Sequence, residues 1–128
     1  MAVMGLGIDL VEVSDAGRLL ERWGERLLNR VLTDAEREYV LQFARPAKHL
    51  AVRIAAKEAV YKALQSVPGA RAIRWRHIEV VRHGDGRPTI MLHGSAAQLA
   101  ERCGGLRIAL SLSHTGKTAG AVALVERE

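Results

Sequence analysis

The chain has 128 residues, 48% of them hydrophobic and 26% charged, with a formal net charge of +5. This length and composition indicate one soluble globular domain over residues 1–128, and the lack of an apolar run of roughly 20 residues excludes a membrane-spanning helix. The positive charge favours an anionic partner, which could be a nucleic acid, a phosphorylated small molecule or an acidic protein.

The N-terminal half predicts one strand followed by three helices. Apolar residues alternate over residues 6–13, which is typical of a strand, and the Gly-Leu-Gly of residues 5–7 is too short for a dinucleotide fingerprint and instead indicates close backbone approach. Ser14 is a candidate cap for a helix that runs to about residue 31. Residues 33–36 form a capping-box signature for a second helix to about residue 43, and a third helix is expected over residues 47–64.

The C-terminal half predicts a hairpin, a short helix and two further strands. Residues 78–81 and 89–92 flank a turn with Asp-Gly chemistry, as in a β-hairpin. Residues 95–98 resemble a capping box for a helix that ends near Gly104. Residues 107–113 alternate as a strand, and the nearly continuous apolar segment 118–125 predicts a central strand. Hairpin-joined strands with helices between them indicate an α+β sandwich.

The predicted helix over residues 47–64 has an unusual distribution of charge. One half of its circumference is small and apolar, and the other half mixes large apolar residues with Arg53, Lys57, Glu58 and Lys62, so a separate polar face is missing. These charges could lie at the edge of a core or an interface, where each would need a partner. Alternatively, they could form ordinary pairs four residues apart on a solvated face, with Glu58 and Lys62 in the favourable order.

Asp9 is the second candidate for chemistry, because it interrupts an apolar face of the predicted strand. A carboxylate in that setting needs a hydrogen-bond donor, a cation or a metal, and a backbone or arginine contact would satisfy it equally well. Together with Glu58 it would supply two hard oxygen donors, which suit Mg²⁺. Arg53, Lys57 and Lys62 would then be placed to neutralise phosphate charge.

Further basic residues lie outside that helix. His114 follows a predicted strand end, where it could be a solvated turn residue or a phosphate ligand. Arginines recur every fourth residue along the first predicted helix and form a basic stripe, namely Arg18, Arg22, Arg26 and Arg30. Because glutamates are interleaved with them, this stripe could be a solvated, salt-bridged face. It could equally dock an acidic helix or a nucleic-acid backbone.

These features, in this order, resemble the short bacterial phosphopantetheinyl transferases, the holo-[acyl-carrier-protein] synthases. The resemblance covers nearly the whole chain and rests on residues 5–12, 30–36, 53–62, 86–88 and 112–115. Its most specific part is the Lys-Glu-x-x-x-Lys of residues 57–62 paired with the early Gly-x-Asp of residues 7–9. The resemblance implies an antiparallel sheet packed against a long central helix and shorter helices.

The same resemblance implies a site. Asp9 and Glu58 would be the Mg²⁺ ligands, coenzyme A would be the donor substrate, and Lys62 would contact its pyrophosphate, so that these three residues carry catalysis. Arg53 and His114 would lie near the nucleotide phosphates. The expected reaction is attack by a carrier-protein serine on the β-phosphate of coenzyme A, which releases adenosine 3′,5′-bisphosphate. Glu58, a metal-linked water and Asp34 are alternatives for the base.

The resemblance also implies partners. The chain would form homotrimers with active sites between subunits, and Arg18, Arg22 and Arg26 would contact an acidic acyl carrier protein. No nucleic-acid or membrane partner is expected. The chain departs from the family pattern at Asp15, Ile54 and Gln65, whereas the proposed metal ligands are retained.

The resemblance implies a role in fatty acid biosynthesis. A cytoplasmic location is expected, because Cys103 is the only cysteine and the first residues lack the pattern of a signal peptide. Two other classes of function stay open on the sequence. A small basic nucleic-acid-binding module would explain the charge and the arginine stripe, although it leaves Asp9 and Glu58 without a role. A non-catalytic oligomeric protein that binds coenzyme A is the other.

Overall fold

The computed structural model describes residues 2–128, and its strands form two antiparallel sheets. The larger sheet has the order β1-β5-β4, built from β1 (Ala2–Glu12), β4 (Leu106–His114) and β5 (Thr118–Arg127). The predicted hairpin forms the second sheet, from β2 (Ile78–Arg82) and β3 (Pro88–Leu92). The prediction that residues 118–125 form a central strand is therefore confirmed.

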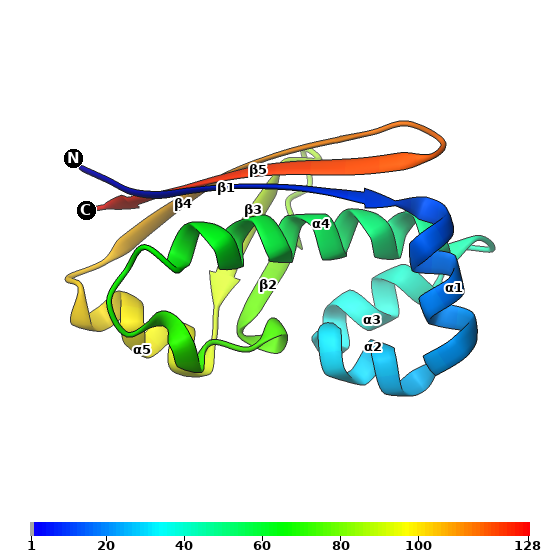
Figure 1. Ribbon diagram of the computed structural model, residues 1–128, viewed down its shortest axis with the longest axis horizontal. Coiled ribbons are helices and arrows are strands. Elements are labelled where there is room, and N and C mark those ends of the chain that lie inside the picture. The colour runs from blue at the N-terminus through cyan, green and yellow to red at the C-terminus, as the bar shows by residue number, and fades with distance from the viewer. Residues whose placement is uncertain (1) are drawn as a thin grey trace.

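Within the described residues, five α-helices accompany the sheets: α1 (Val13–Trp23), α2 (Glu25–Val31), α3 (Asp34–Leu41), α4 (Pro46–Leu64) and α5 (Gly94–Arg102). The longest, α4, lies under the three-stranded sheet, with α2, α3, α5 and β2 on its other side (Figure 1). The predicted α+β architecture around a long central helix is confirmed. Among residues 2–128, no helix has both the length and the apolar character needed to cross a membrane.

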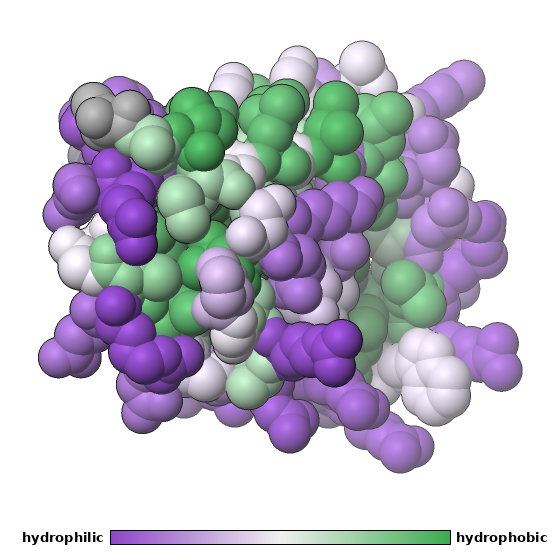
Figure 2. All heavy atoms as spheres, turned by 60° about the vertical axis from the view of Figure 1, so that its left-hand side comes forward, coloured by the Kyte–Doolittle hydropathy of each residue, from purple (hydrophilic) through white to green (hydrophobic). Residues whose placement is uncertain are grey.

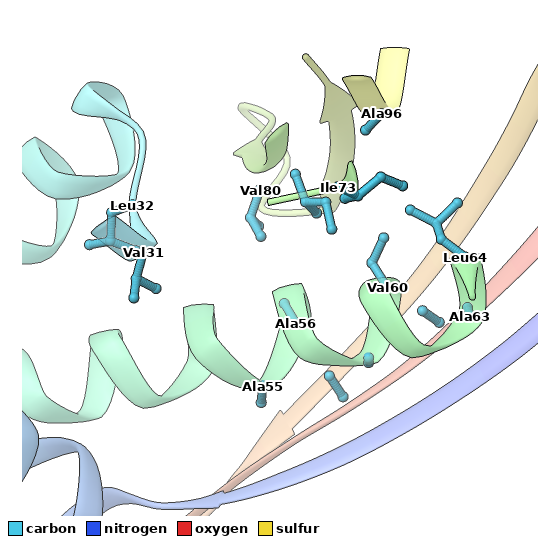
Figure 3. Packing of buried hydrophobic residues seen from close by; sticks show 14 of the residues in the cluster. Val31, Leu32, Ala55, Ala56, Val60, Ala63, Leu64, Ile73, Val80 and Ala96 are labelled. Carbon is cyan, nitrogen blue, oxygen red and sulfur yellow. The ribbon is translucent and has the colours of Figure 1, made fainter. Parts of the chain in front are cut away.

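Small residues set the spacing between α4 and the sheet. A Cβ atom on Gly5 or Gly7 would overlap the carbonyl oxygen of Ala63 or Ala59, so the predicted close backbone approach is confirmed. The opposite side of α4 carries larger side chains, such as Val60, that point into a core shared with the loop before β2 and with α5 (Figure 3). Because the alanines let β1 lie close to α4, side chains on these two elements can meet.

Two predicted helix starts are wrong. The helix expected over residues 14–31 is divided at Gly24, whose φ of 49° is in the left-handed region that favours glycine. Its start is also two residues earlier than a Ser14 cap would give, because Glu12 is the capping residue. Ser95 does not cap α5 either, since its hydroxyl donates to the Ala72 carbonyl at 2.9 Å.

The capping box predicted at residues 33–36 is confirmed. The Thr33 hydroxyl accepts from the Glu36 backbone N–H, and the Glu36 carboxylate accepts from the Thr33 N–H at 2.9 Å. This reciprocal pairing satisfies two backbone donors that a helix start leaves free. It also turns the Glu36 carboxylate back toward the interior, where the side chain is buried.

Candidate functional site

Asp9, Glu58 and Lys62 come together where β1 passes over α4. Asp9 shares the inner face of β1 with the glycines that approach α4. The Lys62 ammonium lies 3.0 Å from Asp9 Oδ1 and donates to the Ile8 carbonyl at 3.1 Å. Glu58 lies one helical turn before Lys62, on the same side of α4. The structure therefore brings together three residues that the sequence pattern had linked.

The pKa of Glu58 reflects both its burial and the nearby carboxylate of Asp9. Burial raises the pKa of its carboxyl above the usual value, the negative charge of Asp9 raises it further, and the Lys62 ammonium opposes both effects. Two carboxylates that repel each other in this way form a site where a cation would be stabilising. The Lys62 ammonium supplies part of that compensation in the structure.

These carboxylates fit a magnesium ion held by few protein ligands. Within residues 2–128, no group of three or more histidine, cysteine, aspartate or glutamate side chains converges on one point. A pair of carboxylates without a thiolate is nevertheless a common donor set for Mg²⁺, which keeps water and substrate phosphate in its remaining positions. The donor chemistry of Asp9 and Glu58 matches that pattern.

A cavity of about 1060 Å³ opens beside Glu58. Tyr61 lines it from the next turn of α4, and Asp34 lines it from the start of α3. The Asp34 carboxylate accepts from the Arg76 guanidinium at 3.2 Å, so it is held at the cavity by a cation. One candidate base from the sequence, Asp34, therefore lies at the same cavity as Glu58.

Arg53 and Lys57 are directed into the protein. Lys57 is fully buried and forms an ion pair with Glu36, and burial lowers the pKa of the Lys57 ammonium while the Glu36 charge opposes that effect. Arg53 is also buried, with its guanidinium 4.5 Å from the centre of the Tyr39 ring. Each of these two cations therefore has a partner inside the chain. A phosphate contact by either residue stays a prediction.

His114 lies on a different strand from the Asp9 site. At the end of β4 it pairs with Ala119 of β5, and Ala119 pairs on its other side with Val11 of β1. The central strand therefore separates His114 from Asp9 within one chain. His114 instead lies near His49, whose pKa is lowered first by burial, then by the charges of Lys48 and Arg53, and less by His114.

The predicted carrier-docking arginines lie on the surface of α1 and α2. Arg18 forms an ion pair with Asp15, so the residue that departs from the family pattern is the partner of a docking residue. The guanidinium groups of Arg22 and Arg26 lie 5.2 and 5.8 Å from the centre of the Trp23 ring. This surface is basic and carries an exposed aromatic side chain at its centre.

Sequence reasoning missed a group of polar residues behind the site. Glu36, Glu79 and His93 were not selected, yet they form a hydrogen-bonded series with Thr33 and Lys57. Two signals were present in the sequence. Lys57 falls within the alanine-rich part of the helix, which implies a buried acid as its partner, and the capping box points Glu36 inward.

Comparison with known proteins gives consistent results. Residues 5–118 match the model of the 4′-phosphopantetheinyl transferase superfamily. The holo-[acyl-carrier-protein] synthase of Moorella thermoacetica is 48% identical over 120 residues, which are 94% of this chain and 91% of that protein. The crystal structure of holo-[acyl-carrier-protein] synthase from Neisseria meningitidis is 30% identical, with a TM-score of 0.87 over 98% of this chain and 99% of that one.

A third similar protein was solved with a ligand. The Chronobacterium ammoniagenes ACPS–CoA complex is 33% identical, with a TM-score of 0.83, and the alignment covers 100% of this chain and 99% of that one. These relatives give no support to the alternative of a nucleic-acid-binding module. They agree instead with the resemblance on which the site residues were predicted.

Proposed function

Because the chain belongs to the 4′-phosphopantetheinyl transferase superfamily, we propose that its reaction takes place at the Asp9–Glu58–Lys62 site. The enzyme transfers the 4′-phosphopantetheine group of coenzyme A to a serine of an apo acyl carrier protein. The products are the holo carrier protein and adenosine 3′,5′-bisphosphate. The observation that carries the location is the convergence of two acids and a lysine beside a large cavity.

Asp9 and Glu58 are the residues that would hold Mg²⁺. When bound, the ion supplies positive charge that polarises phosphate oxygens. Lys62 adds a second positive centre, and its exposed ammonium can exchange the Asp9 carboxylate for a pyrophosphate oxygen. In the reaction, the serine oxygen forms a bond to the β-phosphorus as the bond to the departing nucleotide breaks.

The serine proton needs an acceptor at the cavity. Asp34 and Glu58 are both carboxylates that line it. Burial raises the pKa of Glu58, which strengthens this carboxylate as a base when it is ionised, and Asp34 is held in place by Arg76. Positioning and charge neutralisation supply most of the catalysis in reactions of this class, so either acid would be sufficient.

The active form is proposed to be a homotrimer with sites between subunits. The outer face of β1 exposes Leu6, Ile8 and Leu10 by 66%, 62% and 71%, and β1 is an edge strand. Apolar atoms form a row along the upper edge of the molecule in Figure 2, where the sheet lies. A continuous apolar surface on an open sheet edge favours contact with another chain. A trimer would let His114 of one subunit serve the nucleotide bound at the next.

The acyl carrier protein is proposed to dock on α1 and α2. Arg18, Arg22 and Arg26 would attract an acidic partner, in keeping with the net charge of +5. Arg53 and Lys57, which are enclosed, would act on phosphate through the field and the packing of α4. We place the reaction in the cytoplasm, in fatty acid biosynthesis, where carrier proteins need this group.

One experiment tests the proposed function. The enzyme is mixed with coenzyme A, Mg²⁺ and an apo acyl carrier protein, and the carrier is weighed by mass spectrometry. We expect a phosphopantetheine adduct on the carrier, and we expect a chelator to stop its formation. An unmodified carrier would contradict the transfer, and a rate that is unchanged by chelator would contradict the role of the metal. An Asp9→Asn variant that retains full activity would also contradict the site.

A further inference from the structure

Glu36 joins three elements through one buried carboxylate. Its side chain and that of Lys57 are 1% and 0% exposed. Oε1 accepts from the Lys57 ammonium and from the Thr33 N–H, and Oε2 accepts from the Val80 N–H at 2.9 Å. The start of α3, the middle of α4 and strand β2 are therefore held at one point. A buried carboxylate with this many partners is held in one orientation, because the loss of any one hydrogen bond would leave a desolvated polar group without a partner.

The hydrogen bonds continue from Glu36 to the cavity wall. The Thr33 hydroxyl donates to Glu79 Oε2 at 2.7 Å, and Glu79 Oε1 lies 2.8 Å from Nε2 of His93. Thr33, Glu79 and His93 all line the cavity that Glu58 lines. One polar series thus runs from the interior side of α4 to the surface on which substrate would lie.

The side of α4 that faces the sheet provides little control over the rotation of the helix about its own axis, so the interior side, where Val60 and Lys57 are buried, supplies it. Toward the sheet it presents alanines, and small side chains allow close approach without interlocking strongly. On the interior side of the helix, Lys57 ends in a fully buried ion pair with Glu36, whereas the ion pair of Lys62 with Asp9 is partly exposed and belongs to the site itself. Glu58 is the next residue, about 100° further around the helix. The direction of Glu58 toward β1 is therefore coupled to the position of the Lys57 ammonium.

We propose that Glu36 is a positioning residue for the metal site, which holds Lys57 so that α4 presents Glu58 to Asp9. This inference rests on the proposed function, because it takes Asp9 and Glu58 as the metal ligands. It assigns no contact between Glu36 and substrate. Glu36 acts through Lys57 and the rotation of α4, as supporting groups around metal sites do.

The test measures metal binding by the full-length enzyme. The probe is Mn²⁺ with saturating coenzyme A, and free Mn²⁺ is counted by electron paramagnetic resonance. We expect Glu36→Gln to weaken Mn²⁺ binding by about 10-fold, the lower end of effects seen when supporting groups of metal ligands are removed. Val40→Ala is the matched control, because it removes buried volume from α3, the helix that carries Glu36, without changing any residue of the polar series. We expect it to lower the melting temperature and leave the Mn²⁺ affinity unchanged.

A second variant keeps the test decisive if Glu36→Gln does not fold. The double variant Glu36→Gln/Lys57→Met replaces the ion pair by uncharged side chains of similar length, which commonly restores stability. We expect it to melt near the wild-type temperature and still bind Mn²⁺ about 10-fold more weakly. Wild-type Mn²⁺ affinity in either variant, or equal loss in Val40→Ala, would overturn the proposal. The wild-type enzyme is assayed for carrier modification in parallel, and a failure there would instead count against the proposed function.

Discussion

At the scale of single residues, position decides what each charged side chain of α4 does. Glu58 and Lys62 face β1, where Asp9 brings a second carboxylate close to them. Lys57 and Arg53 face the interior. There Lys57 forms an ion pair with Glu36, and Arg53 lies over the ring of Tyr39. The charges on one helix thus divide into a group available to ligands and a group that supports the helix.

Glu58→Gln removes a proposed metal ligand with little change in shape. We expect the transfer rate to fall by roughly 10²-fold, because metal charge on a phosphate is worth several kcal/mol and each 1.4 kcal/mol is tenfold. The rate is measured by carrier mass spectrometry across a Mg²⁺ titration. Glu101→Gln, on the exposed side of α5, is the control and should keep the wild-type rate. A Glu58→Gln enzyme with wild-type rate and Mg²⁺ dependence would disprove the assignment.

We expect the Glu79 carboxylate to make a pH-dependent contribution to the free energy of unfolding. Burial opposes ionisation of its carboxyl, but hydrogen bonds from His93 and Thr33 outweigh burial and lower its pKa below the usual value. A lowered folded-state pKa means that the contribution is full above the ordinary glutamate pKa of about 4.3 and is lost as pH falls through the folded-state value. Glu79→Gln lacks this contribution at every pH.

The measurement is urea unfolding of the wild type and Glu79→Gln at pH 7 and at pH 3. We expect a larger difference in unfolding free energy between the two proteins at pH 7 than at pH 3. Glu101→Gln should show a small difference at both pH values, since its carboxylate is exposed. A difference for Glu79→Gln that does not change with pH would show that this carboxyl is not stabilised in its ionised form.

At the scale of elements, the packing of β1 on α4 builds the site. Gly5 and Gly7 are two residues apart, so both lie on the inner face of β1. They pack against the carbonyl groups of Ala63 and Ala59, respectively. Asp9 is next on the same face, so the distance between strand and helix also sets the distance between its carboxylate and α4. The two glycines therefore serve the geometry of the site as well as the packing.

Gly7→Ala tests that packing. The added Cβ would overlap the Ala59 carbonyl oxygen, which is backbone and can move only with α4. We expect a loss of about 3 kcal/mol in the free energy of unfolding, at the upper end of overpacking effects, and a reduced transfer rate as β1 moves from α4. Urea unfolding and the carrier assay measure the two effects.

Gly84→Ala is the matched control for Gly7→Ala, because no atom lies within 4 Å of its added Cβ and its φ is not in the left-handed region. It should leave unfolding and transfer almost unchanged. If Gly7→Ala unfolds at the wild-type urea concentration, the close contact does not limit the spacing of β1 and α4.

At the scale of the whole molecule, the outer face of the sheet gathers several exposed large apolar side chains. Leu6, Ile8 and Leu10 of β1 point away from α4 and are more than 60% exposed. His114 lies at the end of the same sheet, one strand beyond β5, separated from the Asp9 of its own chain. The proposed trimer, in which subunits meet along this sheet and share their sites, would account for both observations.

Leu6→Glu places a charge in the proposed subunit interface. We expect the wild type to have the mass of three chains by light scattering and Leu6→Glu to have a smaller mass, because a buried unpaired carboxylate is costly. Transfer activity should fall with the mass if the sites lie between subunits. Leu41→Glu, on α3, introduces the same charge at another exposed leucine and should change neither quantity. A Leu6→Glu protein with unchanged mass would exclude β1 from the interface.

Much of the fold follows from local patterns in the sequence. Alternation predicted β1 and β4, and a nearly continuous apolar segment predicted β5. The Asp-Gly turn predicted the β2–β3 hairpin, and the capping box at Thr33 placed the start of α3. Helix periodicity placed α4 to within one residue. These features depend on neighbours a few residues apart, so the chain specifies them directly. The break at Gly24 was accessible to the same reasoning, because glycine within a helix is unfavourable by about 1 kcal/mol.

The sequence by itself also determined that Asp9, Glu58 and Lys62 are candidates for chemistry, because an acid on an apolar strand face and a helix without a polar side both require partners. Their expected roles came from the family resemblance. Only the tertiary structure decided which charges have those partners inside the chain. Lys57 and Lys62 are the same residue type on one helix, but Lys57 faces Glu36 and Lys62 faces Asp9. Periodicity distinguishes the faces of a helix, whereas the partner of a buried charge depends on which distant segment packs against that face.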